Sequence, residues 1–470
     1  MYFEQFYLTC LSHASYMIGS QGEAAVVDPQ RDVDIYLKAA DEQSLKIRHI
    51  FETHLHADFV SGHKELAART GAQIYIGAQA NAEFPHVPFT DGFEVKMGAV
   101  QVRALETPGH TPESVCLVIT DEEKSAQPCA VLTGDTLFIG DVGRPDLSKT
   151  HTSRELAGLL YDSLHQKLLA LPDAVMVYPA HGAGSLCGRA MRAERSSTIG
   201  TERLTNYALQ IKSREEFIAQ LTANLPNRPD YFLEDAEINR SGAATLAELP
   251  PLPGLSPAEV QALLQQNAHL NVNVLDVRPG DDFAAGHVPG SINIALSGQF
   301  ASWAGGILGI HSMPILIGES DAQVEEARMR LARVGIEDLR GYLSGGVAAW
   351  QKAGLPMLKT AQISPQELNQ KLHSGSLCAS DVIDVRREGE WQAGHIAEVQ
   401  CRALDTFPHG LPLIDQGRPV AVHCKSGYRS IIACSLLERA GHRHVLNVEG
   451  GFDAWHAAEL PEVSELLAKA

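Results

Sequence analysis

The second half of the chain repeats itself, and this repeat restricts the possible folds more than any other feature. An Asp-Val-Arg segment followed by Gly-His occurs twice, as does a later Gly-Gly segment that ends in Trp. Two copies at this separation indicate two similar α/β domains in tandem, because the units of a solenoid are much shorter. The first copy contains residues 274–278, 286–288 and 343–350, and the second contains residues 382–386, 394–396 and 448–455.

The length and the repeat together predict a multidomain α/β protein. A chain of 470 residues is too long for one hydrophobic core. A Pro-rich stretch before the repeat marks the clearest domain boundary. We expect a first domain over residues 1–235, a linker over residues 236–255, and two repeat domains over residues 256–360 and 361–470.

Each repeat copy is expected to open with a capped helix. Ser256 and Ser364 are suitable N-caps, and each is followed by Pro at the first helical position and Glu at the third.

Composition and charge restrict the partners. The fractions of hydrophobic (44%) and charged (20%) residues are typical of a globular protein. The net charge of −19, from 38 basic and 57 acidic residues, argues against nucleic acid or an anionic membrane as the main partner. The first residues show no secretory signal, no apolar run is long enough to span a membrane, and eight scattered cysteines suit a reducing compartment. We therefore expect a cytoplasmic protein, and also a homo-oligomer, a dimer or a tetramer.

A metal-binding motif follows an apolar run in the first half. His54, His56 and Asp58 stand at alternate positions, so their side chains converge if the segment is extended or tightly turned. A histidine after the aspartate would help to hold a second metal, but Phe59 occupies that position. The motif therefore favours a site for one metal.

Four more segments, each at the end of a predicted strand, complete this candidate site. They are Gly109-His110, Gly134-Asp135, Gly143-Arg144 and the segment 179–182, which contains His181. Strand-end loops above a rigid sheet can hold metal ligands in a fixed geometry. The ordered set resembles the metallo-β-lactamase superfamily. That resemblance covers residues 1–235 and implies an αββα sandwich with its metal at one edge.

The replacement of histidine by Phe59 separates two branches of this superfamily. Binuclear zinc hydrolases such as glyoxalase II usually have a histidine there, and an apolar ring leaves a second cation without a full coordination shell. With Ala57-Asp58 and Gly143-Arg144, the departure looks like the persulfide dioxygenases. This resemblance implies one Fe(II) per chain, with His54, His110 and Asp135 as its ligands.

Two imidazoles and one carboxylate form a facial triad that leaves positions on Fe(II) for a sulfur ligand and for O2. His56, Asp58 and His181 are then expected to orient the ligands or bound water, although direct ligation by His56 remains an alternative. Arg144 is the candidate for binding the anionic substrate, and a structural salt bridge is its alternative.

Cys187 lies just past His181 in the sequence and is close enough to approach the site. A free cysteine is more commonly an inert buried residue, so its participation stays open.

The last domain contains a thiol loop between a predicted strand and a predicted helix. Cys424 begins the pattern C-x-x-G-x-R, which includes Gly427 and Arg429, and Lys425 follows the cysteine directly. Backbone N–H groups above a helix N-terminus and nearby cations favour a nucleophilic thiolate. With its flanking motifs the loop resembles that of rhodaneses. The resemblance implies that Cys424 carries a persulfide sulfur and that Arg429 shapes the loop or binds the anionic partner.

The middle copy has the same flanking motifs without this chemistry. Aligning Pro314 with Pro419 places Glu319 at the position of Cys424, and the loop glycine and arginine are missing. We expect a catalytically silent rhodanese-like domain that serves in packing, in dimer formation, in positioning the active copy or merely as a spacer.

The combined resemblance is to a persulfide dioxygenase fused to an inactive and an active rhodanese domain. It implies that a low-molecular-weight thiol persulfide, such as glutathione persulfide, reacts with O2 to give sulfite, and that rhodanese chemistry forms or uses thiosulfate. The alternatives are a zinc-dependent thioester hydrolase of glyoxalase II type with an attached sulfurtransferase, and a sulfur-relay scaffold with a structural metal. The thiol carrier and the direction of sulfur flow are not fixed by the sequence.

Overall fold

A computed structural model describes residues 1–223, 225, 227–265 and 273–465. The chain divides into two compact units. The first contains Met1–Leu249 and Ala332–Gly335, and the second contains Pro250–Leu331 and Ile336–Ala470. Within the described ranges, no helix is both long and apolar enough to span a membrane.

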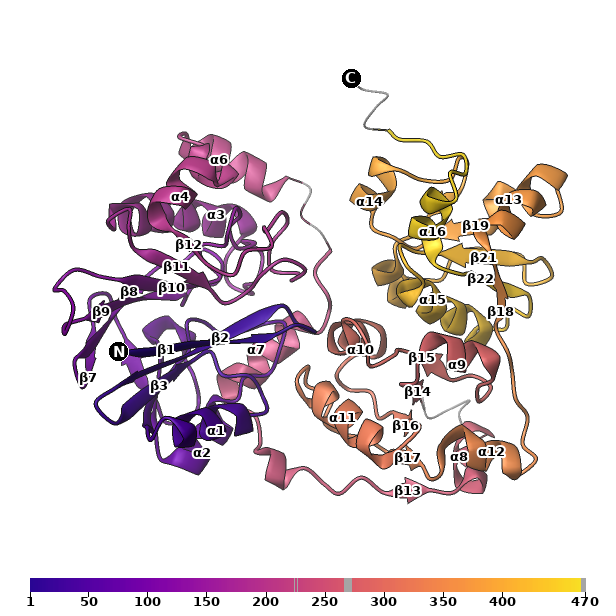
Figure 1. Cartoon of the computed structure of the whole chain (residues 1–470), viewed down its shortest axis with the longest axis horizontal. Helices are drawn as coiled ribbons and strands as arrows, with labels where there is room; N and C mark the ends of the chain where they lie inside the picture. Colours follow the sequence, from indigo (N-terminus) through magenta and orange to yellow (C-terminus); the bar gives the residue numbers. More distant parts are fainter. Residues whose placement is uncertain (224, 226, 266–272, 466–470) are drawn as a thin grey trace. The chain divides into compact units, whose positions relative to one another are not determined.

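The first unit contains two six-stranded sheets (Figure 1). The strands of one sheet are, in spatial order, β1 (Tyr2–Leu8), β2 (His13–Ser20), β3 (Glu23–Val27), β4 (Lys46–Phe51), β5 (Gln73–Gly77) and β6 (Val87–Phe89). Those of the other are β12 (Ser197–Thr198), β11 (Met176–Pro179), β10 (Ala130–Gly134), β9 (Val115–Asp121), β8 (Val100–Glu106) and β7 (Glu94–Met97). Its helices are α1 (Asp34–Glu42), α2 (His63–Thr70), α3 (Ser153–Asp162), α4 (Ile199–Thr205), α5 (Tyr207–Gln210), α6 (Arg214–Thr222) and α7 (Phe232–Ser241).

Three apolar layers hold this unit together. Tyr36 of α1 belongs to the core between the first sheet and its helices. Phe51 belongs to the core between the two sheets, and Leu160 of α3 to the core that covers the second sheet. The layers therefore follow the order helix, sheet, sheet, helix, and the helices lie on both outer sides in Figure 1. This is the expected αββα sandwich.

The second unit contains two five-stranded sheets whose strands pair in parallel. One sheet has the order β13 (Gly254–Leu255), β17 (Gly341–Leu343), β16 (Ile315–Ile317), β14 (Val274–Asp276), β15 (Ile292–Asn293). The other has the order β18 (Ala361–Ile363), β22 (Val445–Val448), β21 (Val420–His423), β19 (Val382–Asp384), β20 (Gln400–Cys401). The helices are α8 (Pro257–Gln265), α9 (Gly280–Ala285), α10 (Phe300–Leu308), α11 (Asp321–Ala332), α12 (Gly346–Lys352), α13 (Pro365–Ser374), α14 (Glu388–Ala393), α15 (Tyr428–Arg439) and α16 (Gly451–Ala457). The two sheets have the same strand order, which agrees with the repeat.

The expected helix starts are confirmed. Ser364 and Glu367 form a reciprocal capping box at α13, with Pro365 at the start of the helix. Ser256 and Glu259 exchange the same hydrogen bonds at α8.

The position of Glu319 in the silent copy needs a correction. Strand β14 pairs with β16 so that Asp276 lies opposite Ile317, whereas in the active copy Asp384 lies opposite His423. The residue after Ile317 is Gly318, so Gly318 and not Glu319 corresponds to Cys424. The alignment on proline was wrong by one residue because the prolines precede the strands and do not fix the sheet register. The conclusion that the copy has no thiol at this position is unchanged.

Candidate active sites

The two imidazoles and the carboxylate expected as metal ligands lie together. His54 lies in the loop after β4, His110 lies between β8 and β9, and Asp135 directly follows β10. The Nε2 atom of His54 lies 3.8 Å from Asp135 Oδ2, and that of His110 lies 3.4 Å from the same oxygen. All three side chains are buried, and neither Nε2 atom has a hydrogen-bond partner. Their donor atoms lie within 4.8 Å of one another, as three ligands of one ion would.

The other nitrogen of each imidazole is held by the protein. His110 Nδ1 lies 2.9 Å from the carbonyl oxygen of Arg144, so it donates its hydrogen there. His54 Nδ1 lies 2.9 Å from Thr53 Oγ1, and the Thr53 hydroxyl donates to Asp28 at 2.9 Å. The hydroxyl is therefore free only to accept from His54. Both Nε2 lone pairs then point toward the site, as metal ligation requires.

A close backbone approach fixes the loop behind His110. A Cβ atom on Gly143 would lie 2.0 Å from the carbonyl oxygen of Asp135 and 2.9 Å from His110 Nδ1. Only glycine fits between these two ligands.

Burial sets the protonation of the ligands. Desolvation lowers the pKa of His54 well below its ordinary value and also lowers the pKa of His110, so both rings are neutral. Burial opposes ionisation of Asp135, but the attraction of His181 and its hydrogen bond outweigh burial, and the pKa of Asp135 falls well below its usual range. Neutral imidazoles and an ionised carboxylate are the forms that bind a metal, so the triad fits a divalent cation.

His181 and Asp58 lie next to the triad. His181 Nδ1 is 2.8 Å from Asp135 Oδ1, and its Nε2 is 2.9 Å from Asp58 Oδ2. Burial lowers the pKa of His181, but the two carboxylates raise it well above its ordinary value. His181 therefore fixes the orientation of the carboxylate of Asp135.

Cys187 approaches this group, as the sequence allowed. It forms a second cluster of candidate ligand atoms with Asp58 and His181. The thiol is buried, and desolvation, followed by the charges of Asp58 and Asp135, raises its pKa well above its ordinary value. In this setting Cys187 is a neutral thiol.

His56 lies with a different set of residues. Its Nε2 atom is 3.2 Å from Asp28 and 3.6 Å from Glu52. These three residues form their own buried cluster, separate from the one that contains His54. These contacts favour a role for His56 behind the triad, where it supports the ligands.

Two residues around the motif, His13 and Asn239, had no role assigned from the sequence. The ring of His13 on β2 lies 4.2 Å from the ring of Phe59, and both side chains are buried. The amide of Asn239 on α7 donates to the carbonyl oxygens of His56 and Phe59 and accepts from the N–H of Ser61. No motif in the sequence pointed to Asn239, which lies in the segment expected as a linker.

Arg144 is engaged within the protein. Its guanidinium forms two hydrogen bonds with Asp146, at 2.6 and 2.8 Å, and a third with the carbonyl of Leu186 at 3.1 Å. The side chain is buried. This arrangement supports the alternative of a structural salt bridge, while binding of the substrate by Arg144 stays a prediction.

In the second unit, Cys424 follows β21 and precedes α15. Its thiol is buried, and the N–H of Gly427 donates to Sγ at 3.1 Å. Gly427 has a φ of 108°, a conformation that glycine adopts without strain. Ser430 Oγ lies 3.7 Å from the sulfur. The loop thus directs polar groups at the sulfur from the start of the helix.

The two cations of this loop, Arg429 and Lys425, differ in their contacts and exposure. Arg429 forms a two-pronged ion pair with Glu390 of α14, at 2.6 and 2.8 Å. Lys425 is exposed. The geometry of Arg429 supports a role in shaping the loop. Binding of the anionic partner by Arg429 stays a prediction, as does the effect of Lys425 on the thiolate.

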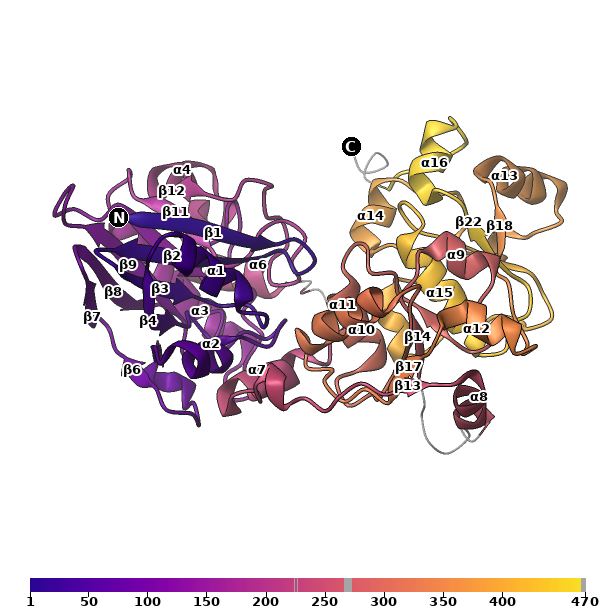
Figure 2. The ribbon, with the colours of Figure 1, turned by 60° about the horizontal axis from the view of Figure 1, so that its bottom comes forward.

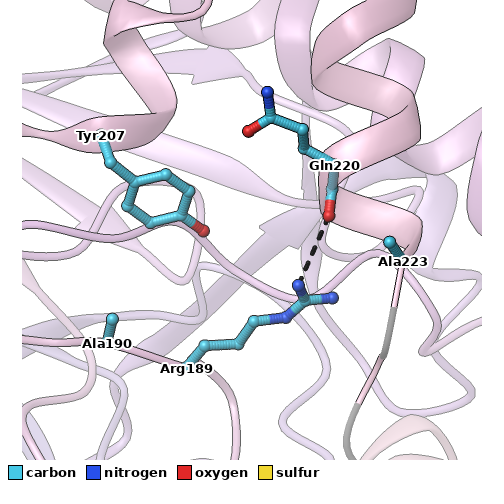
Figure 3. A pocket seen from close by; sticks show the side chains of 5 residues that line it. All are labelled: Arg189, Ala190, Tyr207, Gln220 and Ala223. Atoms are coloured by element: carbon cyan, nitrogen blue, oxygen red, sulfur yellow. Dashed lines mark hydrogen bonds between the residues drawn. The ribbon is translucent and has the colours of Figure 1, made fainter. Parts of the chain in front are cut away.

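An open hollow of about 500 Å³ in the first unit belongs to neither centre (Figure 3). It is lined by Arg189, Ala190, Tyr207, Gln220 and Ala223. The guanidinium of Arg189 donates to the backbone carbonyls of Gln220 and Leu221, the first of which is drawn in Figure 3. Because these bonds occupy the cation, the hollow is not an evident anion site.

Comparisons with protein families agree with this architecture. The model of the metallo-beta-lactamase superfamily matches residues 8–181, and that of the rhodanese-like domain matches residues 256–353 and 364–458.

Individual relatives include a persulfide dioxygenase and a hydrolase. The chain is 31% identical over 222 residues to persulfide dioxygenase ETHE1 of Bos taurus, covering 45% of this chain and 77% of that protein. It is also 31% identical over 247 residues to a hydroxyacylglutathione hydrolase of Rhodospirillum rubrum, covering 51% of this chain and 87% of that protein. A crystal structure of a metallo-beta-lactamase from Staphylococcus aureus subsp. aureus COL covers 73% of this chain and 98% of its own, with 33% identity and a TM-score of 0.65.

The fold and the two centres define a metal-site domain of αββα type joined to two rhodanese-like domains. The chain belongs to the metallo-β-lactamase superfamily, with ETHE1 persulfide dioxygenases among its homologues. The predicted fold class is confirmed.

Proposed function

We propose that this protein is a persulfide dioxygenase with an attached thiosulfate sulfurtransferase. In the first reaction a low-molecular-weight thiol persulfide, O2 and water give the free thiol, sulfite and two protons. The sulfane sulfur is oxidised and O2 is reduced. Glutathione persulfide is the substrate that we would test first.

The observation that carries the proposal is the convergence of two unpartnered imidazole nitrogens and one carboxylate. His54, His110 and Asp135 would hold one Fe(II) per chain. When bound, a ferrous ion in such a triad supplies open positions for a sulfur ligand and for O2. The similarity to ETHE1 persulfide dioxygenases supports this choice of metal.

The residues around the triad prepare the site without touching the reacting atoms. Thr53 and the carbonyl of Arg144 keep both ligand imidazoles in the required tautomer. His181 holds the carboxylate of Asp135. Phe59 brings an apolar ring beside His56, with 4.5 Å between ring centroids, where a further ligand would otherwise stand.

The second reaction takes place at Cys424. A persulfide on Cys424 transfers its outer sulfur to sulfite, the S–S bond breaks, and thiosulfate and the Cys424 thiolate form. The reverse direction would load Cys424 from thiosulfate. The N–H of Gly427 stabilises the thiolate that leaves in the forward direction.

Oxygen uptake by the iron-loaded chain tests the proposal. Protein loaded with Fe(II) without air is mixed with glutathione persulfide in an oxygen electrode, and sulfite is measured in parallel. We expect O2 consumption that is lost in His110→Ala. The absence of O2 uptake by iron-loaded wild-type protein would refute the dioxygenase.

A zinc thioester hydrolase is the second candidate. Asp58, His181 and Cys187 form a further cluster of ligand atoms, and hydroxyacylglutathione hydrolases are among the relatives. This candidate requires two zinc ions per chain and hydrolysis of a glutathione thioester without O2. Elemental analysis separates the two, because the dioxygenase requires one iron per chain.

A further inference from the structure

The silent rhodanese-like domain packs against the helix that follows the thiol loop. Within the second unit, α15 contacts α9 and β15 of the silent domain, and Figures 1 and 2 both draw α9 beside α15. A Cβ atom on Gly280 of α9 would lie 3.1 Å from the Ile431 side chain. The contact therefore includes the first turn of α15, directly after the loop.

Hydrogen bonds from this contact reach the loop itself. The hydroxyl of Tyr428 donates to the carbonyl oxygen of Ala295 in the silent domain at 2.9 Å. Further along α15, the N–H of Asn293 donates to Ser435 Oγ at 3.1 Å. One bond thus lies at the loop and the other lies on the same helix away from the sulfur.

Tyr428 stands next to the group that contacts the thiol. It is the first residue of α15, and its neighbour Gly427 donates to Cys424 Sγ. The Gly427 N–H lies on the preceding peptide, and only the Cα atom of Gly427 separates that peptide from the one that carries the Tyr428 N–H. A displacement of Tyr428 is therefore transmitted to the N–H of Gly427 across a single residue. Hydrogen bonds weaken steeply with misalignment, and those to a charged acceptor are the stronger ones.

We propose that the silent domain positions the thiol loop, and that Tyr428 is the positioning residue through its bond to Ala295. The hydroxyl fixes the start of α15, which keeps the Gly427 N–H directed at Cys424. The silent domain then raises the reactivity of Cys424 near neutral pH without supplying a reacting group. The inference rests on the proposed sulfur transfer at Cys424 for its biological meaning, although the loop geometry can be measured without it.

The test compares two variants of the 470-residue chain. Tyr428→Phe removes the bond at the loop and keeps the ring, whereas Ser435→Ala removes another hydrogen bond to the silent domain, away from the loop. The rate of Cys424 alkylation by iodoacetamide is measured from pH 5 to 10, with mass spectrometry identifying the modified cysteine. Thiosulfate:cyanide sulfur transfer and the thermal midpoint are measured in parallel.

We expect Tyr428→Phe to shift the alkylation profile to higher pH and to lower the rate near neutral pH by about three- to tenfold, as the loss of one hydrogen bond would. Ser435→Ala should retain the wild-type profile even if its thermal midpoint falls. A wild-type profile in Tyr428→Phe, or equal shifts in both variants, would overturn the inference. Lack of Cys424-dependent sulfur transfer in the wild type would instead overturn the proposed function, because the alkylation comparison still reports on the loop.

Discussion

Thr53 connects a buried carboxylate to His54, a proposed metal ligand, through one hydroxyl. Its single hydrogen goes to Asp28, and it therefore accepts from His54. Asp28 also accepts the Thr53 N–H at 2.7 Å, so the threonine is held at two points. The orientation of His54 is thus set by a residue outside the proposed ligand set.

Replacing this hydroxyl should weaken iron binding. In Thr53→Val the shape is retained, but His54 Nδ1 and Asp28 each lose a buried partner. We expect the Fe(II) affinity to fall by about 10- to 100-fold, as is usual for groups that orient metal ligands. Competition with a chromophoric Fe(II) chelator measures the change.

Thr222→Val is the matched control for this measurement. The Thr222 hydroxyl donates to the carbonyl of Ile218 within α6 and lies outside the metal site. Its Fe(II) affinity should equal that of the wild type. If both variants bind iron equally well, Thr53 has no positioning role.

The ion pair between Arg429 and Glu390 allows a test of how the thiol loop is shaped. If Arg429 acts through this pair, Glu390→Gln should lower the turnover of thiosulfate:cyanide sulfur transfer about as much as Arg429→Lys does. A loss of about tenfold is expected, because one member of a partly buried charged pair loses its partner. A large effect of Arg429→Lys alone would instead indicate direct binding of the anion by Arg429.

At the scale of elements, α15 joins the thiol loop to a largely buried acid. Glu438, near the end of the helix, lies 3.1 Å from the Thr360 hydroxyl and 3.4 Å from His287 Nε2. Burial raises the pKa of Glu438 to about 7, and the hydrogen bond from Thr360 offsets only part of this effect. His287 does not supply a compensating charge, because burial lowers its pKa to about 4.

This acid should make the stability of the second unit depend on pH. With a folded pKa above the unfolded one, the folded state binds more protons between about pH 4.5 and pH 7. The stabilisation by protonated Glu438 is therefore fully present below pH 4.5. As the pH rises through 7, the free energy of unfolding falls by about 3 kcal/mol at most. Glu438→Gln mimics the protonated acid, so we expect it to raise the free energy of unfolding relative to wild type at pH 8 and not at pH 4.

Urea unfolding at both pH values measures this difference. Glu449→Gln, at an exposed position in the same unit, is the control and should give the wild-type values. A stabilisation by Glu438→Gln that is equal at pH 4 and pH 8 would contradict the assignment.

The elements show which parts of the structure could be predicted from the sequence. The strand before Asp135, the helix starts after Ser256 and Ser364, and the tandem repeat follow from turn residues, capping residues and the repeated segments themselves. The register of Gly318 against Cys424 could not be predicted, because it is set by pairing with a distant strand.

The same limit applies within the metal site. His54, His110 and Asp135 could be predicted to meet, since each follows a predicted strand. The residues that support these ligands could not be predicted. Asn239 bonds to residues about 180 positions earlier in the chain, and only the packing of α7 brings them together.

At the scale of the whole molecule, the two centres lie in different compact units. Each should therefore keep its own chemistry when the other is disabled. We expect His110→Ala to lose iron and O2 uptake but to retain sulfur transfer at Cys424. Cys424→Ser should retain its iron and O2 uptake.

These two variants also test whether joining the centres in one chain matters. A tether holds two reacting partners at an effective concentration that dilution of the protein does not change. We therefore mix equal amounts of His110→Ala and Cys424→Ser and compare the mixture with the intact chain as both are diluted, with glutathione persulfide and O2 supplied. The ratio of thiosulfate to sulfite should stay constant for the intact chain and fall for the mixture. Equal ratios at every dilution would mean that sulfite leaves one centre before it reaches the other, and that the fusion serves some purpose other than transfer.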